Sequence, residues 1–303
     1  MERRYVTADV FSSLAFQGNP VAVVLDADSL SSEQMQRIAA EFGYSETTFV
    51  LPPKNPENSA WVRIFSPSKE FPFAGHPNIG TAYVLAMEMY NAGSLPPKTM
   101  IFEEAAGLVR IRILFEAGKP IGAELVAPEQ LSRLATVELK QIAACLSLSA
   151  DEIEVATHAP QVASVGLPFI IVELKSQEAL RQCVPNLTEY KLTVPVSGAT
   201  SIYAYTKVSG GLHDTADVNL EARTFTNRMT EDPGTGSATA AAVALLARLY
   251  SKKTMTARVM QGVSVGRPSV INVRYTYDSA EEVRISGECV TIMQGKFSLK
   301  GDG

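Results

Sequence analysis

Short apolar runs rich in β-branched and aromatic residues alternate with polar turns along most of this chain, a pattern that predicts strands. Such runs lie at residues 21–25, 61–65, 108–115 and 270–277. Helical periodicity is less common. Residues 31–42 begin with a serine suited to the N-cap and have an acidic first turn, so we expect a helix there. We expect another helix at residues 131–146.

Two further expected helices, residues 79–90 and 237–250, differ from these because small or apolar side chains cover nearly every face. A helix that is apolar all round is buried on all sides. Strands wrapped around each of these helices would bury them. Each helix follows a turn rich in glycine and proline, FPFAGHPNIGTA at residues 71–82 and EDPGTGSATAAA at residues 231–242.

The two halves of the chain repeat the same motifs in the same order. GNP followed by VAVVL (18–25) matches GLP followed by FIIVEL (166–174), and VRIFS (62–66) matches ARTFT (222–226). TTFV (47–50) has a weaker counterpart in SIYA (201–204), and AGH (74–76) aligns with PGT (233–235). A long period that occurs twice predicts two similar domains, and ordinary α+β alternation is the alternative.

We place the halves at residues 1–118 and 119–303, with the crossover at residues 119–129. A C-terminal strand near residues 290–303 is expected to pack back onto the first half. The predicted class is α+β, with strands around one central helix in each half.

Composition narrows the classes of partner. The chain has 303 residues, is 46% apolar and carries a formal charge of -5, which gives no electrostatic reason to expect nucleic acid or an anionic membrane. Cys145, Cys183 and Cys289 have neither metal-ligand nor disulfide spacing and are expected to be reduced core residues. The N-terminus turns polar too early for a signal peptide, and the longest apolar run is short, so we expect a cytoplasmic protein.

The glycine-led turns carry the first candidate chemistry. A helix start leaves several backbone N–H groups unpaired at the positive end of the helix dipole, which makes an anion site. We therefore expect Gly75 in the first turn, and Gly234, Thr235 and Gly236 in the second, to bind a small carboxylate substrate from two sides. Glycine lets the backbone amides approach the substrate closely.

Several side chains near these turns could act on such a substrate. Glu46 stands at the start of an apolar strand, which is costly for a carboxylate unless it is exposed, paired or functional. His76 is expected to be largely neutral, because the helix dipole disfavours a cation there. A surface strand end for Glu46 and a turn-stabilising role for His76 are the alternatives.

Asp232 and Ser237 flank the second turn and could cap the helix or contact a ligand. His158 and His213 lie in polar, loop-like stretches, and we expect no catalytic role for them. Three histidines do not form a metal-ligand pattern, so we expect no metal. The chain also lacks a P-loop, a GxGxxG unit and a Gly-x-Ser-x-Gly elbow.

Taken together, QGNPVAVV (17–24), YSETTFV (44–50), FAGHPNIGTA (73–82), EDPGTGSA (231–238) and QGVSVGRPS (261–269) resemble the PhzF-like phenazine-biosynthesis isomerase family over nearly the whole chain. The resemblance implies a diaminopimelate-epimerase-like fold: two pseudo-symmetric β-barrel-like halves, each around a central helix, with the site in the cleft between them. It also implies a cofactor-independent isomerase, usually a homodimer.

In that family a glutamate moves a proton across trans-2,3-dihydro-3-hydroxyanthranilate. The resemblance assigns this role to Glu46, with His76, Asp232 and Ser237 as partner residues. Epimerases of the same fold use two cysteines at the helix starts, where this chain has Ala74 and Pro233, so we expect no two-thiol epimerisation. A non-catalytic binding module and an epimerase or racemase without thiols are the alternative functions.

Overall fold

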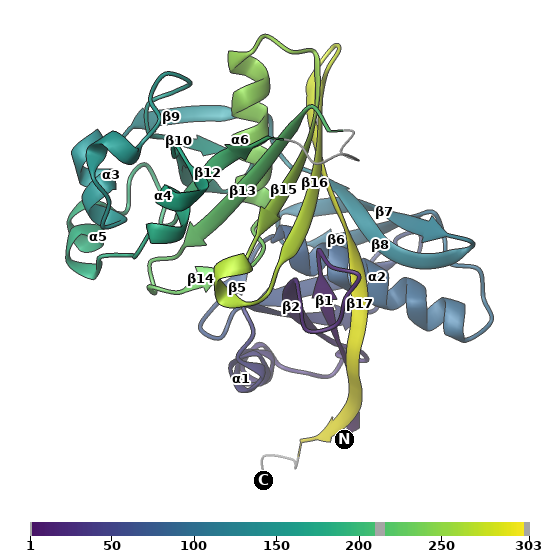
Figure 1. Cartoon of the computed structure of the whole chain (residues 1–303). Helices are drawn as coiled ribbons and strands as arrows, with labels where there is room; N and C mark the ends of the chain where they lie inside the picture. The colour runs from purple at the N-terminus through teal and green to yellow at the C-terminus, as the bar shows by residue number, and fades with distance from the viewer. Residues whose placement is uncertain (1, 210–215, 300–303) are drawn as a thin grey trace. The chain divides into compact units, whose positions relative to one another are not determined.

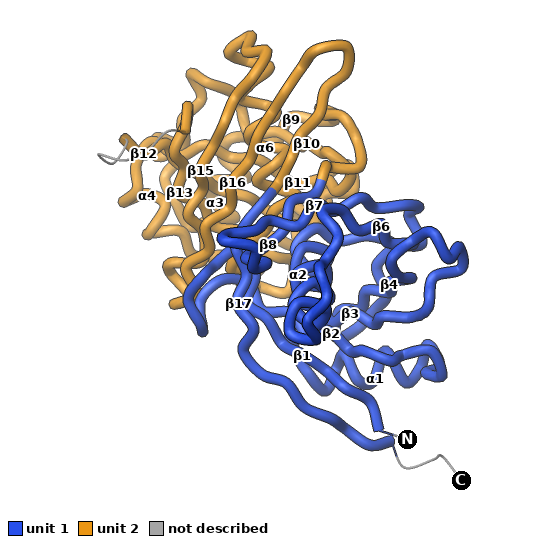
Figure 2. Tube along the Cα trace, turned by 90° about the vertical axis from the view of Figure 1, so that its right-hand side faces the viewer, with its two compact units in different colours: residues 1–125, 286–303 blue, residues 126–285 orange. Residues whose placement is uncertain are grey.

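The computed structural model of the chain describes residues 2–209 and 216–299 (Figure 1). These residues form two compact units, coloured separately in Figure 2. Unit 1 comprises residues 1–125 and 286–303, and unit 2 comprises residues 126–285. Within the described ranges, no helix is both long and apolar enough to cross a membrane.

In unit 1, eight strands of the described residues close into a barrel. Their order around the barrel is β1, β2, β3, β4, β6, β7, β8 and the C-terminal part of β17, which pairs again with β1. The bounds are β1 (Glu2–Val10), β2 (Asn19–Val24), β3 (Glu46–Leu51), β4 (Ala60–Phe65), β6 (Thr99–Glu104), β7 (Gly107–Glu116), β8 (Lys119–Val126) and β17 (Glu281–Ser298). The short strand β5 (Glu70–Phe71) pairs with β4.

The helix α2 (Gly75–Asn91) packs against β1, β2, β3 and β7 and is buried along most of its first ten residues. Gly80 shows how closely the helix approaches the strands, because a Cβ there would lie 2.6 Å from Val21 Cγ1 and 2.8 Å from Val10 Cγ2. The smaller helix α1 (Ser32–Phe42) covers the outer side of β2, β3 and β4 with Met35, Ile38 and Ala39. The apolar sequence of α2 is thus explained by its position inside the strands.

Unit 2 is built from β9 (Ser132–Thr136), β10 (Gln161–Ser164), β11 (Pro168–Glu173), β12 (Ile202–Val208), β13 (Val218–Phe225), β15 (Thr254–Gln261) and β16 (Ser269–Tyr277), paired in that order, with β14 (Glu231–Asp232) beside β13. Its central helix α6 (Gly236–Leu249) packs against β10, β11, β15 and β16 and is buried over nearly its whole length. The helices α3 (Leu139–Cys145), α4 (Gln177–Gln182) and α5 (Leu187–Thr193) share a second apolar core with β10, β11 and β12.

Strand pairing confirms that the two units have the same internal order. From β1 through β2, β3, β4, β6 and β7, neighbours pair antiparallel, parallel, antiparallel, parallel and antiparallel. The series from β10 through β11, β12, β13, β15 and β16 has the same alternation. In both units the central helix is inserted between the short strand and the next parallel strand, so the predicted α+β duplication is confirmed.

Some boundaries differ from the prediction. Residues 131–146 do not form one helix: they contain β9 and then the short helix α3. Residues 132–136 form a strand because they pair antiparallel with β10, and only Ser132 and Ala135 of β9 are half-buried. The expected crossover at residues 119–129 is mainly the strand β8, and the central helices begin at Gly75 and Gly236.

Candidate active site

Glu46 and His76 come together in unit 1. Glu46 is the first residue of β3, and His76 is the second residue of α2. Oε2 of Glu46 lies 3.4 Å from Nδ1 of His76, and the two side chains are 19% and 7% exposed. Glu46 is therefore not a strand-end residue directed wholly into solvent. At this distance the carboxyl group and the imidazole can share one proton.

Asn19 joins this pair. It is the first residue of β2, it is fully buried, and its Nδ2 lies 3.5 Å from Nδ1 of His76. The preceding Gly18 has a φ of 71°, and a Cβ at that position would lie 2.3 Å from the carbonyl oxygen of Val10. Only glycine fits this turn without strain. The turn at Gly18 thus directs the side-chain amide of Asn19 toward His76.

The strand that carries Glu46 is tied to the helix that carries His76. Thr48, two residues after Glu46, places its Oγ1 2.8 Å from Oγ1 of Thr81 on α2, and both residues are fully buried. A buried hydroxyl pair of this kind fixes the relative position of two elements, because either partner alone would lose its hydrogen bond. The separation of Glu46 and His76 is consequently held by the core and not by flexible loops.

The helix start beside His76 has no side-chain cap. Ala74 is the N-cap residue, and its methyl group accepts no hydrogen bond. By contrast, the outer helices α1, α4 and α5 are capped by the side chains of Ser31, Ser176 and Asn186. An uncapped first turn presents backbone amide donors to an anion.

The corresponding turn of unit 2 is organised around Asp232 and Thr235. Thr235 is the N-cap residue of α6, again without a side-chain cap bond. Its hydroxyl instead donates to Oδ2 of Asp232 at 2.6 Å. Asp232 is the last residue of β14, is half-buried and lies three residues before the N-cap residue. Its carboxylate is held at the turn by a threonine hydroxyl.

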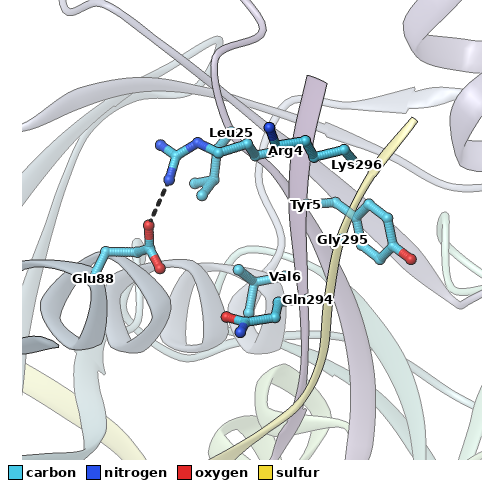
Figure 3. A pocket seen from close by; sticks show the side chains of 8 residues that line it. All are labelled: Arg4, Tyr5, Val6, Leu25, Glu88, Gln294, Gly295 and Lys296. Atoms are coloured by element: carbon cyan, nitrogen blue, oxygen red, sulfur yellow. Dashed lines mark hydrogen bonds and ion pairs between the residues drawn. The ribbon is translucent and has the colours of Figure 1, made fainter. Parts of the chain in front are cut away.

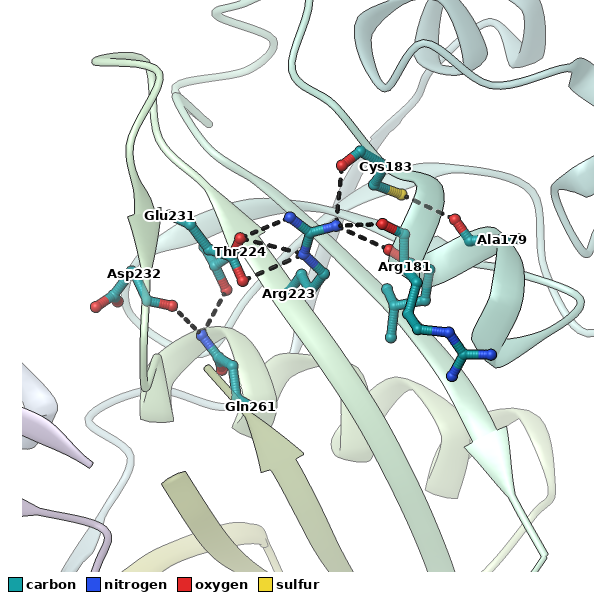
Figure 4. Close-up of polar contacts among 9 residues, drawn as sticks. Ala179, Arg181, Cys183, Arg223, Thr224, Glu231, Asp232 and Gln261 are labelled. Atoms are coloured by element: carbon teal, nitrogen blue, oxygen red, sulfur yellow. Dashed lines mark hydrogen bonds and ion pairs between the residues drawn. The ribbon is translucent and has the colours of Figure 1, made fainter. Parts of the chain in front are cut away.

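Gln261, the last residue of β15, holds the turn from the other side (Figure 4). Its Nε2 donates to the backbone oxygen of Asp232 at 2.7 Å and to the hydroxyls of Thr235 and Thr224 at 3.0 and 3.1 Å. Its Oε1 accepts a hydrogen bond from the backbone N–H of Thr235 at 3.1 Å. One fully buried amide thus fixes the N-cap residue and the residue that carries the carboxylate.

An arginine–glutamate pair precedes each turn and establishes which residues correspond. In unit 1, Arg63 Nε and Nη2 donate to Oε1 and Oε2 of Glu70, both at 2.7 Å. In unit 2, Arg223 Nη2 donates to Oε2 of Glu231 at 2.7 Å (Figure 4). Each arginine also lies over the phenylalanine two residues further along its strand.

Counted from these glutamates, the N-cap residues Ala74 and Thr235 are equivalent, and so are the second helical residues His76 and Ser237. The sequence alignment of Ala74 with Pro233 was therefore wrong by two residues. The alignment pairs Pro233-Gly234 with Ala74-Gly75, but α6 starts two residues later, at Gly236. Neither N-cap position holds a cysteine, so the conclusion on thiols is unchanged.

The remaining histidines and cysteines lie elsewhere. His158 is buried, and its Nε2 lies 2.8 Å from the hydroxyl of Tyr205, which donates to Glu173 at 2.9 Å; burial lowers the pKa of this imidazole. His213 lies outside the described residues. All three cysteines are buried, and burial raises the pKa of each thiol, in Cys183 to about 12. Thiolate chemistry is disfavoured at all three.

A surface hollow in unit 1 contains none of the predicted site residues (Figure 3). It lies among β1, β17 and α2, and its charged groups are engaged in ion pairs: Arg4 with Asp26 at 2.9 Å and Glu88 at 2.8 Å, and Lys296 with Glu2 at 3.2 Å. Glu88 follows His76 by twelve residues, about 18 Å along the helix axis. We therefore do not assign the active site to this hollow.

Sequence reasoning missed Asn19, Gln261 and Thr224 as parts of the two turns. Asn19 and Gln261 lie in the motifs GNP and QGVSVGRPS, which were used as family markers without assigning a role to these amides. Each motif does contain a usable signal: Asn19 is next to Gly18 and Gln261 is next to Gly262, and both glycines have a positive φ. A turn of this kind fixes the direction of the neighbouring side-chain amide. Thr224 carries no such signal.

Comparison with known proteins shows the family of the chain. The family model for phenazine biosynthesis-like proteins (PhzC-PhzF) matches residues 8–295. A trans-2,3-dihydro-3-hydroxyanthranilate isomerase of Pseudomonas chlororaphis is 33% identical in an alignment that covers 97% of this chain and 99% of that protein. An uncharacterized isomerase of Mesorhizobium japonicum is also 33% identical, over 98% of this chain and 99% of its own length.

Solved structures agree on the fold. The Bacillus anthracis phenazine biosynthesis protein of the PhzF family superimposes with a TM-score of 0.85 and 24% identity, covering 99% of this chain and 100% of its own. A hydroxyproline epimerase from Agrobacterium vitis has a TM-score of 0.60 at 14% identity, covering 98% of this chain and 91% of its own. The predicted diaminopimelate-epimerase-like fold is confirmed.

Proposed function

Because this chain belongs to the phenazine biosynthesis-like family and is an isomerase, we propose that it shifts a proton within a small cyclic or conjugated carboxylate without a cofactor. The reaction would be similar to that named for trans-2,3-dihydro-3-hydroxyanthranilate isomerase. Glu46 is the proposed general acid and base. The observation that carries the proposal is the 3.4 Å separation between Oε2 of Glu46 and Nδ1 of His76.

The proton step is balanced without any redox partner. Oε2 of Glu46 takes a proton from a carbon next to, or vinylogous to, the conjugated system, and the C–H electron pair enters that system. The same carboxyl group then returns the proton to another carbon, which restores the carboxylate. No electrons are gained or lost overall, so a flavin or nicotinamide has no step to perform.

His76 is suited to support this step because its Nδ1 faces the carboxyl group. When Glu46 holds the proton, its O–H can donate to Nδ1, and when Glu46 is ionised, Nδ1–H can donate to the carboxylate. Asn19 approaches the same nitrogen at 3.5 Å. The pair therefore has a hydrogen-bonding arrangement for both forms of the base, as a returning proton requires.

We propose further that the helix starts at Gly75 and at Gly234, Thr235 and Gly236 bind the substrate carboxylate and the developing negative charge, and that Asp232 and Ser237 contact other polar groups of the substrate. The uncapped starts of α2 and α6 supply backbone amide donors that suit an anion. The second residues of these helices, His76 and Ser237, supply side-chain hydrogen-bond groups. Asp232, braced by Thr235 and Gln261, suits an amino or hydroxyl substituent.

Epimerisation by two thiols is not proposed, because the N-cap positions are Ala74 and Thr235 and every cysteine is buried. The sequence leaves two alternative functions: a binding module that keeps the shape of the site, which the isomerase relatives disfavour, and an epimerase that uses Glu46 without thiols. The Glu46–His76 contact favours an enzyme, since binding alone does not require a titratable pair.

Incubation in heavy water tests the proposal. The protein is mixed with trans-2,3-dihydro-3-hydroxyanthranilate and with a panel of cyclic conjugated acids, and carbon-bound deuterium is followed by NMR. Proton migration or deuterium incorporation in one of these acids supports an isomerase. Binding without exchange would indicate a binding module, and loss of optical activity in a panel of amino acids would indicate an epimerase.

We also propose that the protein is a homodimer, as its family resemblance implies, and that it is cytoplasmic, as its reduced cysteines and polar N-terminus suggest. Sedimentation equilibrium over a range of protein concentrations tests the dimer, and cell fractionation tests the location. A monomer at micromolar concentration, or recovery in the membrane or secreted fraction, would contradict these two points separately.

A further inference from the structure

The strand registers show which residues of the two units correspond. In unit 1, Thr47 of β3 lies opposite Phe65 of β4. In unit 2, Ile202 of β12 lies opposite Phe225 of β13. Phe65 and Phe225 are equivalent, because each contacts the arginine of its own strand and pairs with the glutamate that binds this arginine. Thr47 and Ile202 therefore occupy the same position in their units.

The parallel neighbours of these strands give the same result. The residues opposite Thr47 and Ile202 in β2 and β11 each lie four positions after the positive-φ glycine of the GNP or GLP motif. Glu46 precedes Thr47, and Ser201 precedes Ile202. Ser201 is consequently the counterpart of Glu46. The sequence alignment of Ser201 with Thr47 was therefore wrong by one residue.

Both strands present this face to the central helix of their unit. In unit 1 the buried threonine pair between β3 and α2 shows this for Glu46. In unit 2 the hydroxyl of Tyr203, two residues after Ser201, lies 3.1 Å from Oγ1 of Thr239 on α6, and both residues are fully buried. The backbone oxygen of Ser201 accepts from the N–H of Ile170 at 3.0 Å, so Ser201 continues the ladder of β12. Side chains two residues apart on a strand project to the same face, so Ser201 projects toward α6.

Unit 2 has no titratable side chain at the three positions that form the proton-transfer group of unit 1. The counterparts of Glu46, His76 and Asn19 are, in this order, Ser201, Ser237 and Leu167. All three counterparts are half-buried. Among residues 2–209 and 216–299, neither serine hydroxyl has a hydrogen-bond partner. Both hydroxyls are thus available to a ligand.

The short side chains also explain why the two serines do not bond to each other. In unit 1, Glu46 and His76 together span the distance from the strand start to the helix start and meet at 3.4 Å. The oxygen of a serine is bonded directly to Cβ, whereas the carboxyl oxygens of a glutamate lie two carbon atoms further out. Two serine hydroxyls cannot meet across a separation that a glutamate and a histidine bridge. A polar group of a bound substrate can join them.

We propose that Ser201, together with Ser237, binds a ring hydroxyl of the substrate and is a specificity-determining residue of the proposed reaction. The inference deepens the proposed function and rests on it. A serine hydroxyl both donates and accepts, which matches a substrate hydroxyl. The helix starts suit the carboxylate and Asp232 suits an amino group, so a ring hydroxyl is the polar group left to the two serines. Leu167 adds an apolar contact for the ring. Unit 1 then carries the proton transfer, and this part of unit 2 carries recognition.

Binding of two aromatic acids tests the inference without turnover. 3-Hydroxyanthranilate and anthranilate differ by one ring hydroxyl, and as aromatic acids they have no proton to shift. In titration calorimetry the wild-type protein should bind 3-hydroxyanthranilate more tightly than anthranilate. Ser201→Ala should reduce this preference about five-fold, the factor that one hydrogen bond between neutral groups supplies. The affinity for anthranilate should stay nearly unchanged.

Three further variants separate the hydroxyl from other effects. Ser201→Thr keeps a hydroxyl and should keep the preference. Thr200→Ala, the matched control, removes an exposed hydroxyl from the neighbouring residue and should keep it as well. Ser201→Leu places a large side chain beside the ring and should weaken binding of both acids at least about ten-fold. A wild type without the preference, a Ser201→Ala protein that retains it, or normal binding by Ser201→Leu would overturn the inference.

Kinetics distinguishes the inference from the proposed function. With trans-2,3-dihydro-3-hydroxyanthranilate, Ser201→Ala should raise KM about five-fold and leave kcat nearly unchanged, because Glu46 and His76 lie in unit 1. If the binding preference depends on Ser201 but no acid is turned over, the recognition role stands and the proposed function fails. If turnover occurs and Ser201→Ala leaves both the preference and KM unchanged, the recognition role fails alone.

Discussion

Oε2 of Glu46 lies 3.4 Å from Nδ1 of His76, although the strands β4 and β5 separate the two residues along the chain. The barrel brings the two residues together, because the start of β3 lies beside the start of α2, the helix that the barrel encloses. Both groups stand on regular elements joined by the buried pair Thr48 and Thr81. A base and its partner on rigid elements are held closer to one geometry than loop residues would be.

Asn19→Leu should lower kcat about five-fold, because it removes the amide that approaches His76 at 3.5 Å, and such a contact is worth about 1 kcal/mol. Steady-state kinetics with the active acid measures the effect. Asn186→Ala is the control: it removes the cap of α5 and should cost about 1 kcal/mol of stability with kcat unchanged. Equal losses of kcat in both variants would refute a specific role for Asn19.

Gly75→Ala should impair substrate binding and spare stability, whereas Gly80→Ala should lower stability. A Cβ at position 75 would meet its nearest atom, Cδ2 of Leu125, at 4.0 Å, so the fold should tolerate it. KM should nevertheless rise about ten-fold or more, because the methyl group would obstruct an anion approaching the backbone amide. A Cβ at position 80 would clash with Val21 and Val10, so Gly80→Ala should lower stability by about 1–3 kcal/mol.

Urea unfolding and kinetics on both variants decide the matter. Gly75→Ala with wild-type KM would show that the helix start does not bind the substrate. An unchanged midpoint for Gly80→Ala would contradict the close approach of α2 to the strands.

Gln261→Ala should destabilise unit 2 by about 1–3 kcal/mol, because it leaves buried groups of Asp232 and Thr235 without a partner. KM should rise with little change in the rate of the proton step. Gln177→Ala, which removes one exposed hydrogen bond to Glu221, should stay within about 0.5 kcal/mol of the wild type. Calorimetry compares the two, and equal stabilities would refute the bracing role of Gln261.

The architecture could be predicted from the sequence because its strongest patterns, the apolar helices and the helix cap, allow few alternative structures. Helices that are apolar on every face had to be buried, and α2 and α6 are. Ser31 with Gln34 forms a capping box that fixes the start of α1 at the expected residue. The segment 131–146 was misread because β9 pairs with β10, a partner more than twenty residues away that local periodicity does not include.

The proximity of Glu46 and His76 was predicted from family resemblance, whereas local sequence left each residue with an ordinary alternative. The two-residue error at Pro233 has a simple origin. Two glycines, Gly234 and Gly236, could each have opened the helix, and the deciding contact between Arg223 and Glu231 depends on strand pairing. Ser201 was missed because the sequence alignment paired it with Thr47, whereas the strand registers make it the counterpart of Glu46.

Burial raises the pKa of Glu104, the last residue of β6, so Glu104→Gln should change how stability depends on pH. In the unfolded chain this carboxyl titrates near its ordinary value of 4.5, and in the folded chain the pKa is about 8. The native state thus keeps a proton that the unfolded state loses. Its stabilising contribution is complete below pH 4.5 and declines by about 1.4 kcal/mol per pH unit until the pH passes 8.

The advantage of Glu104→Gln over the wild type should therefore grow from pH 4.5 to 8 and then level off. Chemical denaturation at closely spaced pH values measures the difference, in which the contributions of all other groups cancel. Parallel curves for the two proteins would mean that Glu104 is not buried as an acid.

The most direct test of the proton shift is Glu46→Gln in the heavy-water assay. This change keeps the size of the side chain and removes its ability to take up a proton. Turnover and deuterium incorporation should fall by about 10³-fold or more, beyond the loss of an accessory acid or base, while the melting temperature and the affinity for the bound acid stay close to the wild type. A Glu46→Gln protein that keeps most of its activity would show that another group moves the proton.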